Sequence, residues 1–218
     1  MGDEFMKTHY QIFLDYLDKE DKDHALLYVL DLLKENKISL LELYDDYLKP
    51  ALNDFVCAST DEDFCIWKEH TRTSIVRSIL ESSYPHLIEA KKDVMRNNQK
   101  VVVVCPSEEF HEVGAMIVTN HFLLCGFDAM FIGANTPKHD ILAAVKALKP
   151  DFLALSVTNY YNLVITKQIT DQVKALYPNV KVILGGLAFT KPGALAHLTY
   201  DYYLNSLEAI KTLGGEQQ

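Results

Sequence analysis

Apolar residues in the first half of the chain recur every three or four positions, the spacing of helices that bury one face. The predicted helices cover about 5–18, 21–36, 39–55 and 60–83, with a final helical stretch to 97. Ser39 and Glu42 form a capping box at the start of the third helix, and Pro50 predicts a bend inside it. Because the connections between these helices are short, residues 1–97 are predicted to form an up-and-down four-helix bundle.

After residue 97 the pattern changes to short apolar runs separated by Gly and Pro. Strands are predicted at 101–104, 129–132, 152–156, 180–184 and 200–204, and helices at 110–124, 137–148, 163–176, after Pro192 and at the C-terminal end. The run 101–104 contains no polar residue, which is typical of a strand buried on both faces. This alternation predicts an α/β fold over residues 98–218, with five parallel strands in a doubly wound sheet.

The composition narrows the class of protein. With 49% apolar residues the chain of 218 residues can build a core, so we do not expect a disordered protein. The net charge of -9 repels phosphate backbones, which argues against direct nucleic-acid binding. No apolar run reaches the ~20 residues of a membrane span, and residues 1–10 lack the apolar segment of a signal peptide. We therefore predict a cytoplasmic protein without a membrane partner.

The cysteines supply no motif of their own. They are Cys57, Cys65, Cys105 and Cys125. No two of them form a C-x-x-C pair, and their spacing matches neither a zinc knuckle nor a disulfide framework. We predict that they are buried free thiols in a reducing compartment.

Polar and small residues directly follow three of the predicted strands. They are Glu109, His111 and Gly114 after the first strand, Ser156 and Thr158 after the third, and Gly185 and Gly186 after the fourth. Because the carboxyl ends of parallel strands meet at one edge of a sheet, these residues are predicted to share a site. An acidic residue two positions before a histidine can accept its Nδ1 proton, which leaves Nε2 as a lone-pair donor for a metal. A glycine three positions after the histidine allows a bulky ligand to approach the backbone.

Each of these features has an ordinary structural explanation when taken alone. A histidine in a strand-to-helix loop is common, a serine at a strand end is often a cap, and a Gly-Gly pair is often a turn. Their order and spacing are more specific, since 41 residues separate Gly114 from Ser156 and 26 separate Thr158 from Gly185. In type, order and spacing the set resembles the signature of cobalamin (vitamin B12)-binding domains, which reads D-x-H-x-x-G, S-x-L and G-G.

This resemblance implies a flavodoxin-like (Rossmann-like) sheet that binds cobalamin. It implies that His111 displaces the dimethylbenzimidazole base and is the lower ligand to cobalt. The residues that line the slot for the displaced nucleotide tail are then Ser156, Thr158, Gly185 and Gly186. Two residues depart from the signature: Glu109 stands in place of the Asp and Thr158 in place of the Leu. Glu109 keeps the carboxylate but carries it on a longer arm.

The helical half resembles the cap that precedes the cobalamin domain in methionine synthase, corrinoid proteins and CarH-type photoreceptors. Glu69 and His70 lie where these caps commonly carry an E-H pair, and Trp67 shares a helix face with His70. The resemblance implies that this face lines the upper side of the corrin ring, with His70 as a candidate upper ligand to cobalt. The alternative is a solvated helix face with Trp67 packed sideways.

The form of the cofactor is left open between adenosyl-, methyl- and hydroxocobalamin. In CarH-type sensors a Trp ten residues before the E-H pair covers the adenosyl group, and Ser59 occupies that position here. The same sensors carry a DNA-binding domain of the MerR type before the cap, whereas the bundle occupies residues 1–95 of this chain.

Three functional hypotheses follow. Gly114 is not followed by the Lys-Asn typical of methyl-carrying corrinoid proteins, which favours a stand-alone light- or B12-responsive sensor that signals to a protein partner such as a regulator or kinase. The alternative is a corrinoid methyl carrier that serves a methyltransferase. A flavodoxin-like domain that binds no cobalamin explains the alternation but not the spacing. No Ser-His-Asp set or carboxylate pair predicts a catalytic residue of the chain's own, and homo-oligomerisation is left open.

Overall fold

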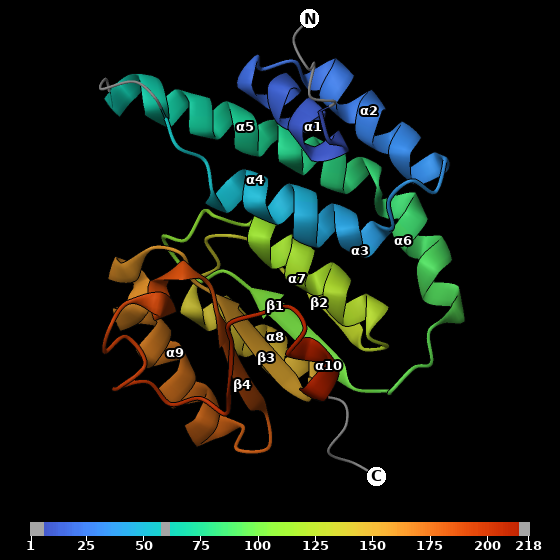
Figure 1. Cartoon of the computed structure of the whole chain (residues 1–218). Coiled ribbons are helices and arrows are strands. Elements are labelled where there is room, and N and C mark those ends of the chain that lie inside the picture. Colours follow the sequence, from blue (N-terminus) through green and yellow to red (C-terminus); the bar gives the residue numbers. More distant parts are fainter. Residues whose placement is uncertain (1–6, 58–61, 214–218) are drawn as a thin grey trace, which may run out of the picture. The chain divides into compact units, whose positions relative to one another are not determined.

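The chain divides into two compact units, Met1–Glu89 and Ala90–Gln218, the first helical and the second built on a sheet. The computed structural model describes residues 7–57 and 62–213 (Figure 1). The division falls earlier in the sequence than the boundary expected at residue 97, which stays a prediction.

The helical unit is built from short amphipathic helices with defined caps. Its elements are α1 (His9–Asp18), α2 (Lys22–Lys34), α3 (Leu40–Glu42), the π-helical segment η1 (Leu43–Leu48), α4 (Lys49–Asn53), α5 (Glu62–Ser82) and α6 (Tyr84–Ala90), which leads into the 3₁₀ turn η2 (Lys91–Asp93). The predicted capping box is present: the Glu42 amide donates to the Ser39 hydroxyl at 3.1 Å, and the Ser39 amide donates to the Glu42 carboxylate at 2.6 Å. The last helical stretch ends at Asp93 rather than at Asn97. The predicted helix starts at residues 5 and 60 lie outside the described residues.

A local widening of the helix accommodates Pro50. Proline lacks an N–H, and in an α-helix its ring collides with the carbonyl group four residues earlier. In η1 the Lys49 amide donates to the carbonyl of Tyr44, five residues back, which makes a wider turn than that of an α-helix. The third predicted helix is therefore the succession α3, η1 and α4 rather than one bent α-helix.

The core of the helical unit lies where α1, α2, α5 and the α3–α4 segment pack together. Its fully buried side chains include Phe13, Val29, Leu43, Tyr44, Leu48, Val76 and Ile79. Since α5 buries only one face in this core, its other face is exposed to solvent. Among the described residues, no helix combines the length and the apolar character needed to cross a membrane.

Within residues 90–213 the second unit folds into a five-stranded parallel sheet (Figure 1). Its strands are β1 (Lys100–Val104), β2 (Asp128–Phe131), β3 (Phe152–Ser156), β4 (Lys181–Gly185) and β5 (Tyr202–Leu204). Its helices are α7 (Val113–Leu124), α8 (Lys138–Leu148), α9 (Leu163–Leu176) and α10 (Ile210–Leu213), with the 3₁₀ turns η3 (Tyr160–Asn162) and η4 (Leu187–Thr190). The strand order is β2-β1-β3-β4-β5, which is the flavodoxin-like order and confirms the predicted fold class.

The sheet separates two apolar layers. Val102 and Val104 of β1 face the layer of α8 and α9, whose fully buried members include Ile141, Ile169 and Val173. Val101 and Val103 face the other layer, which contains Phe122 of α7 and Ile210 of α10. Because both faces of the sheet are covered, the loops at the carboxyl ends of the strands are the place where polar residues can form a site.

The prediction of a helix after Pro192 is wrong. The chain forms η4 before the proline and a series of turns after it. The Ala194 and Ala196 amides donate to the carbonyls of Lys191 and Gly193, three residues back, so that no α-helical turn forms. Gly193 has a φ of +79°, and this left-handed backbone interrupts a right-handed helix.

Two cysteines are not free thiols, contrary to the prediction. Cys57 and Cys65 form a disulfide, with 5.6 Å between their Cα atoms. Cys105 and Cys125 are free, and Cys105 is buried as predicted. Cys57 and Cys65 are eight positions apart, the first after α4 and the second near the start of α5. The spacing of the cysteines alone does not indicate that they pair.

Candidate functional site

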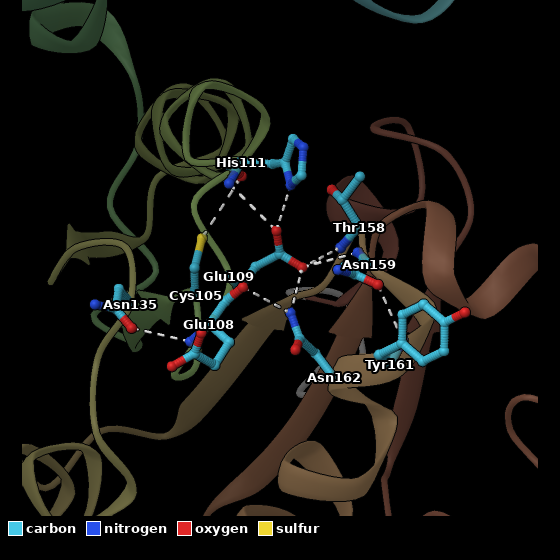
Figure 2. Close-up of polar contacts among 9 residues, drawn as sticks. All are labelled: Cys105, Glu108, Glu109, His111, Asn135, Thr158, Asn159, Tyr161 and Asn162. Carbon is cyan, nitrogen blue, oxygen red and sulfur yellow. Dashed lines mark hydrogen bonds and ion pairs between the residues drawn. The ribbon is translucent and has the colours of Figure 1, made fainter. Parts of the chain in front are cut away.

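The loop between β1 and α7 carries Glu109 and His111 at the carboxyl edge of the sheet (Figure 2). A left-handed backbone at Glu108, with a φ of 63°, turns the chain at this point. The Glu108 amide donates to Asn135 Oδ1 at 2.9 Å, and the Asn135 amide donates to the Glu109 carbonyl at 2.9 Å. These reciprocal bonds fix the loop to the segment that follows β2.

Both carboxylate oxygens of the buried Glu109 accept hydrogen bonds (Figure 2). Oε1 lies 2.6 Å from His111 Nδ1. Oε2 accepts from the Thr158 and Asn159 amides at 2.8 and 2.9 Å, and from Asn162 Nδ2 at 3.2 Å. One side chain thereby joins the loop after β1 to the loop after β3, and this brings together predicted residues from two strands.

The hydrogen bonds keep the Glu109 carboxyl group ionised. Burial by itself raises the pKa of a carboxyl group, because the charged form loses its hydration. Here the donors from His111, Asn159, Thr158 and Asn162 outweigh burial and lower the pKa of Glu109 to about 2. At neutral pH a fixed negative charge therefore lies beside the imidazole ring.

His111 is anchored through one ring nitrogen. Because a carboxylate can only accept, Nδ1 carries the proton of the 2.6 Å contact, and the lone pair of the neutral ring is on Nε2. The His111 side chain is 58% exposed, so the ring is accessible at the edge of the sheet. A histidine that ligates a metal commonly has its other ring nitrogen bonded to a carboxylate in this way.

Two of the glycines predicted at the site lie in different surroundings. Gly186 has a φ of +114°, and a Cβ there would lie 2.3 Å from the Val157 carbonyl oxygen, so only glycine fits. This close approach packs the loop after β4 against the loop after β3. A Cβ at Gly114 would meet nothing within 4 Å, so the start of α7 is open on that side.

Ser156 and Thr158 contribute to the site through different groups. Ser156 pairs with Gly185 between β3 and β4, and the thiol of Cys105 at the end of β1 donates to the His111 carbonyl at 3.8 Å. Burial raises the pKa of Cys105 to about 12, so this thiol is neutral and is not prepared as a metal ligand. Thr158 acts on Glu109 through its backbone amide. The replacement of the signature Leu by Thr therefore leaves this contact intact.

Sequence reasoning missed three asparagines that hold the site. Asn135 fixes the loop after β1, and the buried Asn162 donates to both Glu109 and the Glu108 carbonyl. Asn159 accepts from the Tyr161 amide at 3.0 Å and so caps η3. The contacts of Asn162 with the β1 loop span more than 50 positions, and no spacing rule marks them. The available signal was the presence of two asparagines, Asn159 and Asn162, in the short segment between β3 and α9.

The other residues that were predicted to contact the cofactor belong to the helical unit. Trp67, Glu69 and His70 lie on α5, and all three are exposed, Trp67 to 45%. Lys68 Nζ lies 5.7 Å from the centre of the Trp67 ring. The contact of these residues with a cofactor stays a prediction. Ser59, which marks the position of the sensor Trp, lies outside the described residues.

The flavodoxin-like fold and the anchored histidine are features of a known family of domains, and the sequence matches that family. Residues 99–204 match the family model described as B12 binding domain, and this part of the chain is a B12-binding domain. Such a domain implies a cobalamin cofactor. The match begins just before β1 and ends with β5, so it contains the loops of Glu109, Thr158 and Gly186.

Relatives of two kinds are similar to parts of this chain. The HTH-type transcriptional repressor CarH of Myxococcus xanthus is 30% identical over 130 residues, which cover 59% of this chain and 42% of the repressor. The trimethylamine corrinoid protein of Methanosarcina barkeri is 27% identical over 109 residues, or 49% of this chain and 50% of that protein. The chain therefore spans half or less of the length of these relatives.

A solved structure extends the likeness in fold beyond the B12-binding domain. The monomethylamine corrinoid protein of Methanosarcina barkeri matches with a TM-score of 0.76 and 14% sequence identity, covering 96% of this chain and 98% of that protein. At this identity the match establishes a common fold, which includes helices before the sheet.

Proposed function

We propose that this chain binds cobalamin with the lower base displaced and with His111 as the lower cobalt ligand, and that it works as a light- or B12-responsive sensor signalling to a protein partner. The observation that carries the ligand assignment is the buried, ionised Glu109, which holds Nδ1 of an otherwise accessible histidine. The proposed partner is a regulator or a kinase.

The residues at the carboxyl edge fit a large corrinoid. The open space beside Gly114 leaves room above the start of α7, and Gly186 leaves no side chain where the two loops meet. Exposed apolar side chains surround the edge, among them Phe110 at 64% and Leu187 at 49%. A bound corrinoid would cover such surface favourably. When bound, cobalamin would supply a cobalt atom that can exchange or release a ligand.

Two observations favour the sensor. The chain is similar to a transcriptional repressor, and its loop after Gly114 lacks the Lys-Asn of methyl carriers. In this proposal the exposed face of α5 with Trp67 and His70 meets the upper side of the cofactor. Because neutral imidazole is a common metal ligand, His70 is proposed as an upper ligand in one of the signalling states.

The alternative function is that of a corrinoid methyl carrier with a methyltransferase partner. The similarity to the trimethylamine corrinoid protein favours it. Methylation of the cobalamin-loaded protein by a methyltransferase, after reduction, would support the carrier, whereas a dark–light difference without such methylation would support the sensor.

Absorption spectroscopy tests the ligand assignment directly. The protein is mixed with hydroxo-, methyl- and adenosylcobalamin, and we expect spectral shifts that disappear in His111→Ala. Glu109→Gln is the sharper variant, because its amide nitrogen can donate to Nδ1 and place the ring proton on Nε2, the atom needed for the metal. Its spectrum should resemble that of His111→Ala. A His111→Ala protein with an unchanged spectrum would show that another group is the lower ligand.

A further inference from the structure

The long helix α5 packs into the core of the helical unit along only its second half. Its buried side chains are Arg72, Ile75, Val76, Ile79 and Leu80. In the first half of α5 (residues 62–71), none of the side chains that the structure describes is buried. Figure 1 shows this half extending beyond α1 and α2. Because an isolated stretch of this length is marginal as a helix in water, the first half depends on other contacts to keep its position.

A disulfide and an ion pair connect the first half of α5 to the rest of the helical unit. Cys65, in the first turn of the helix, is bonded to Cys57. One turn further along, Lys68 forms an ion pair with Glu20, and both side chains are partly exposed. Exposed ion pairs contribute little to stability. The covalent bridge is therefore the stronger of these two constraints.

The segment that carries Cys57 is also held to the second half of α5. The ring centre of Phe55 lies 4.6 Å from the guanidinium carbon of Arg72, which is buried. This contact does not involve the bridge. After reduction it therefore keeps the Cys57 thiol close to the helix, so that the bridge can form again.

The surroundings of the bridge allow a reductant to reach it. Cys57 and Cys65 are both partly exposed, whereas the free thiol of Cys105 is buried. One thiolate of a dithiol attacks a sulfur of the bridge, which gives a mixed disulfide and releases the other cysteine as a thiolate. The second thiol of the reductant then displaces the first cysteine. In total two electrons and two protons pass to the bridge, and the reductant becomes a disulfide.

We infer that the Cys57–Cys65 bridge is a redox-sensitive tether for the first half of α5, opened by cellular dithiols and closed by disulfide exchange. In the bridged state the helix is held from its first turn, and Trp67 and His70 are presented in fixed positions. In the dithiol state the first half keeps its ion pair and its helical hydrogen bonds but frays more often. The consequence for the cofactor rests on the proposed function: ligation of cobalt by His70 then has to order more of the helix, so reduction weakens it.

Hydrogen exchange tests the tether without any cofactor. The full chain is compared in its bridged form and after treatment with dithiothreitol, and peptides from residues 66–71 and 73–82 are followed by mass spectrometry. We expect reduction to accelerate exchange in 66–71 by at least about ten-fold and to leave 73–82 nearly unchanged. A Cys57→Ser, Cys65→Ser double variant should exchange at the faster rate with or without the reductant. Equal rates in 66–71 for the bridged and reduced chains would overturn the tether.

Alkylation of native protein in glutathione buffers tests whether the bridge responds to thiols. The reduced fraction of Cys57 and Cys65 should rise and fall reversibly with the ratio of reduced to oxidised glutathione, while circular dichroism shows the chain to stay folded. Cys125→Ser is the matched control, since Cys125 is a free cysteine of the sheet unit, and it should leave this response intact. A bridge that opens only in denaturant would overturn the redox-sensitive role.

Hydroxocobalamin tests the link between the tether and the cofactor. Because thiols themselves ligate and reduce cobalt, the double variant takes the place of the reduced protein here. The part of the spectrum that depends on His70, measured by difference with His70→Ala in each background, should fall several-fold without the bridge. An equal contribution of His70 in both backgrounds, or none in either, would overturn the link. A spectrum that does not depend on His111 would contradict the proposed function instead, and hydrogen exchange would still decide on the tether.

Discussion

The two histidines proposed for cobalt lie in contrasting surroundings. His111, in the sheet unit, is anchored to a buried carboxylate that joins two loops. His70 lies on the exposed face of α5 in the helical unit. Two positions further along α5, the buried Arg72 forms an ion pair with Asp18, and its guanidinium carbon lies 4.6 Å from the centre of the Phe55 ring. These contacts hold the inner face of α5, whereas the side chain of His70 is exposed on the outer face.

This contrast separates a preorganised ligand from a conditional one. The bonds of Glu109 orient the His111 ring before a ligand arrives, so metal binding there does not have to order the side chain. An exposed histidine such as His70 has to be ordered when it binds. That cost suits a ligand which is exchanged during signalling, as the proposed function requires, and not one which holds the cofactor permanently.

The largest expected effect concerns the stability of the sheet unit in acid. The pKa of Glu109 is about 2 in the folded protein against an ordinary value of 4.5. Below about pH 4.5 the unfolded chain therefore binds a proton that the folded protein does not, and the stabilising contribution is lost as the pH falls towards 2. The difference corresponds to about 3 kcal/mol in the free energy of unfolding.

Urea unfolding between pH 5 and pH 2, followed by circular dichroism, measures this loss. Glu109→Gln supplies the control, because it cannot ionise and should lack that part of the acid dependence. Trp67 is the only tryptophan in the sequence and lies in the helical unit, so its fluorescence reports that unit separately. Equal acid dependence in the two proteins would contradict the ionised, buried state of Glu109.

The next effect concerns the disulfide of the helical unit. Reduction of Cys57–Cys65 opens a short closed loop that ends in the first turn of α5, and it should lower the stability of this unit by about 2 kcal/mol. Thermal unfolding followed by Trp67 fluorescence, with and without dithiothreitol, measures the change. A Cys57→Ser, Cys65→Ser double variant should not respond to the reductant.

Thiol titration in denaturant gives the chemical check on the bridge. Two of the four cysteines should react before reduction, namely Cys105 and Cys125, and all four afterwards. Four reactive thiols in the untreated protein would contradict the presence of the Cys57–Cys65 disulfide.

Some parts of the site can be predicted from the sequence, and others cannot. The parallel sheet and the place of His111 at its edge follow from periodicity and spacing, since the side chains at the ends of parallel strands must share an edge. The partners of Glu109 after β3 do not follow from such rules, because backbone amides carry no sequence signal and Asn162 is joined to Glu109 only by the tertiary fold. The disulfide was missed for the same reason, since its formation depends on how the folded chain brings Cys57 and Cys65 together and not on their spacing.

The smallest effect on stability, and the sharpest test of the contrast, concerns the face of α5. Because Trp67 and His70 are exposed, Trp67→Ala and His70→Ala should each change the free energy of unfolding by less than about 0.5 kcal/mol. The exposed His139 on α8 supplies a control, His139→Ala, with a similarly small change. If His70 is an upper ligand, His70→Ala should abolish a dark–light spectral difference that His139→Ala retains. A difference that survives His70→Ala would leave His111 as the proposed protein ligand and would restrict the helical unit to covering the cofactor.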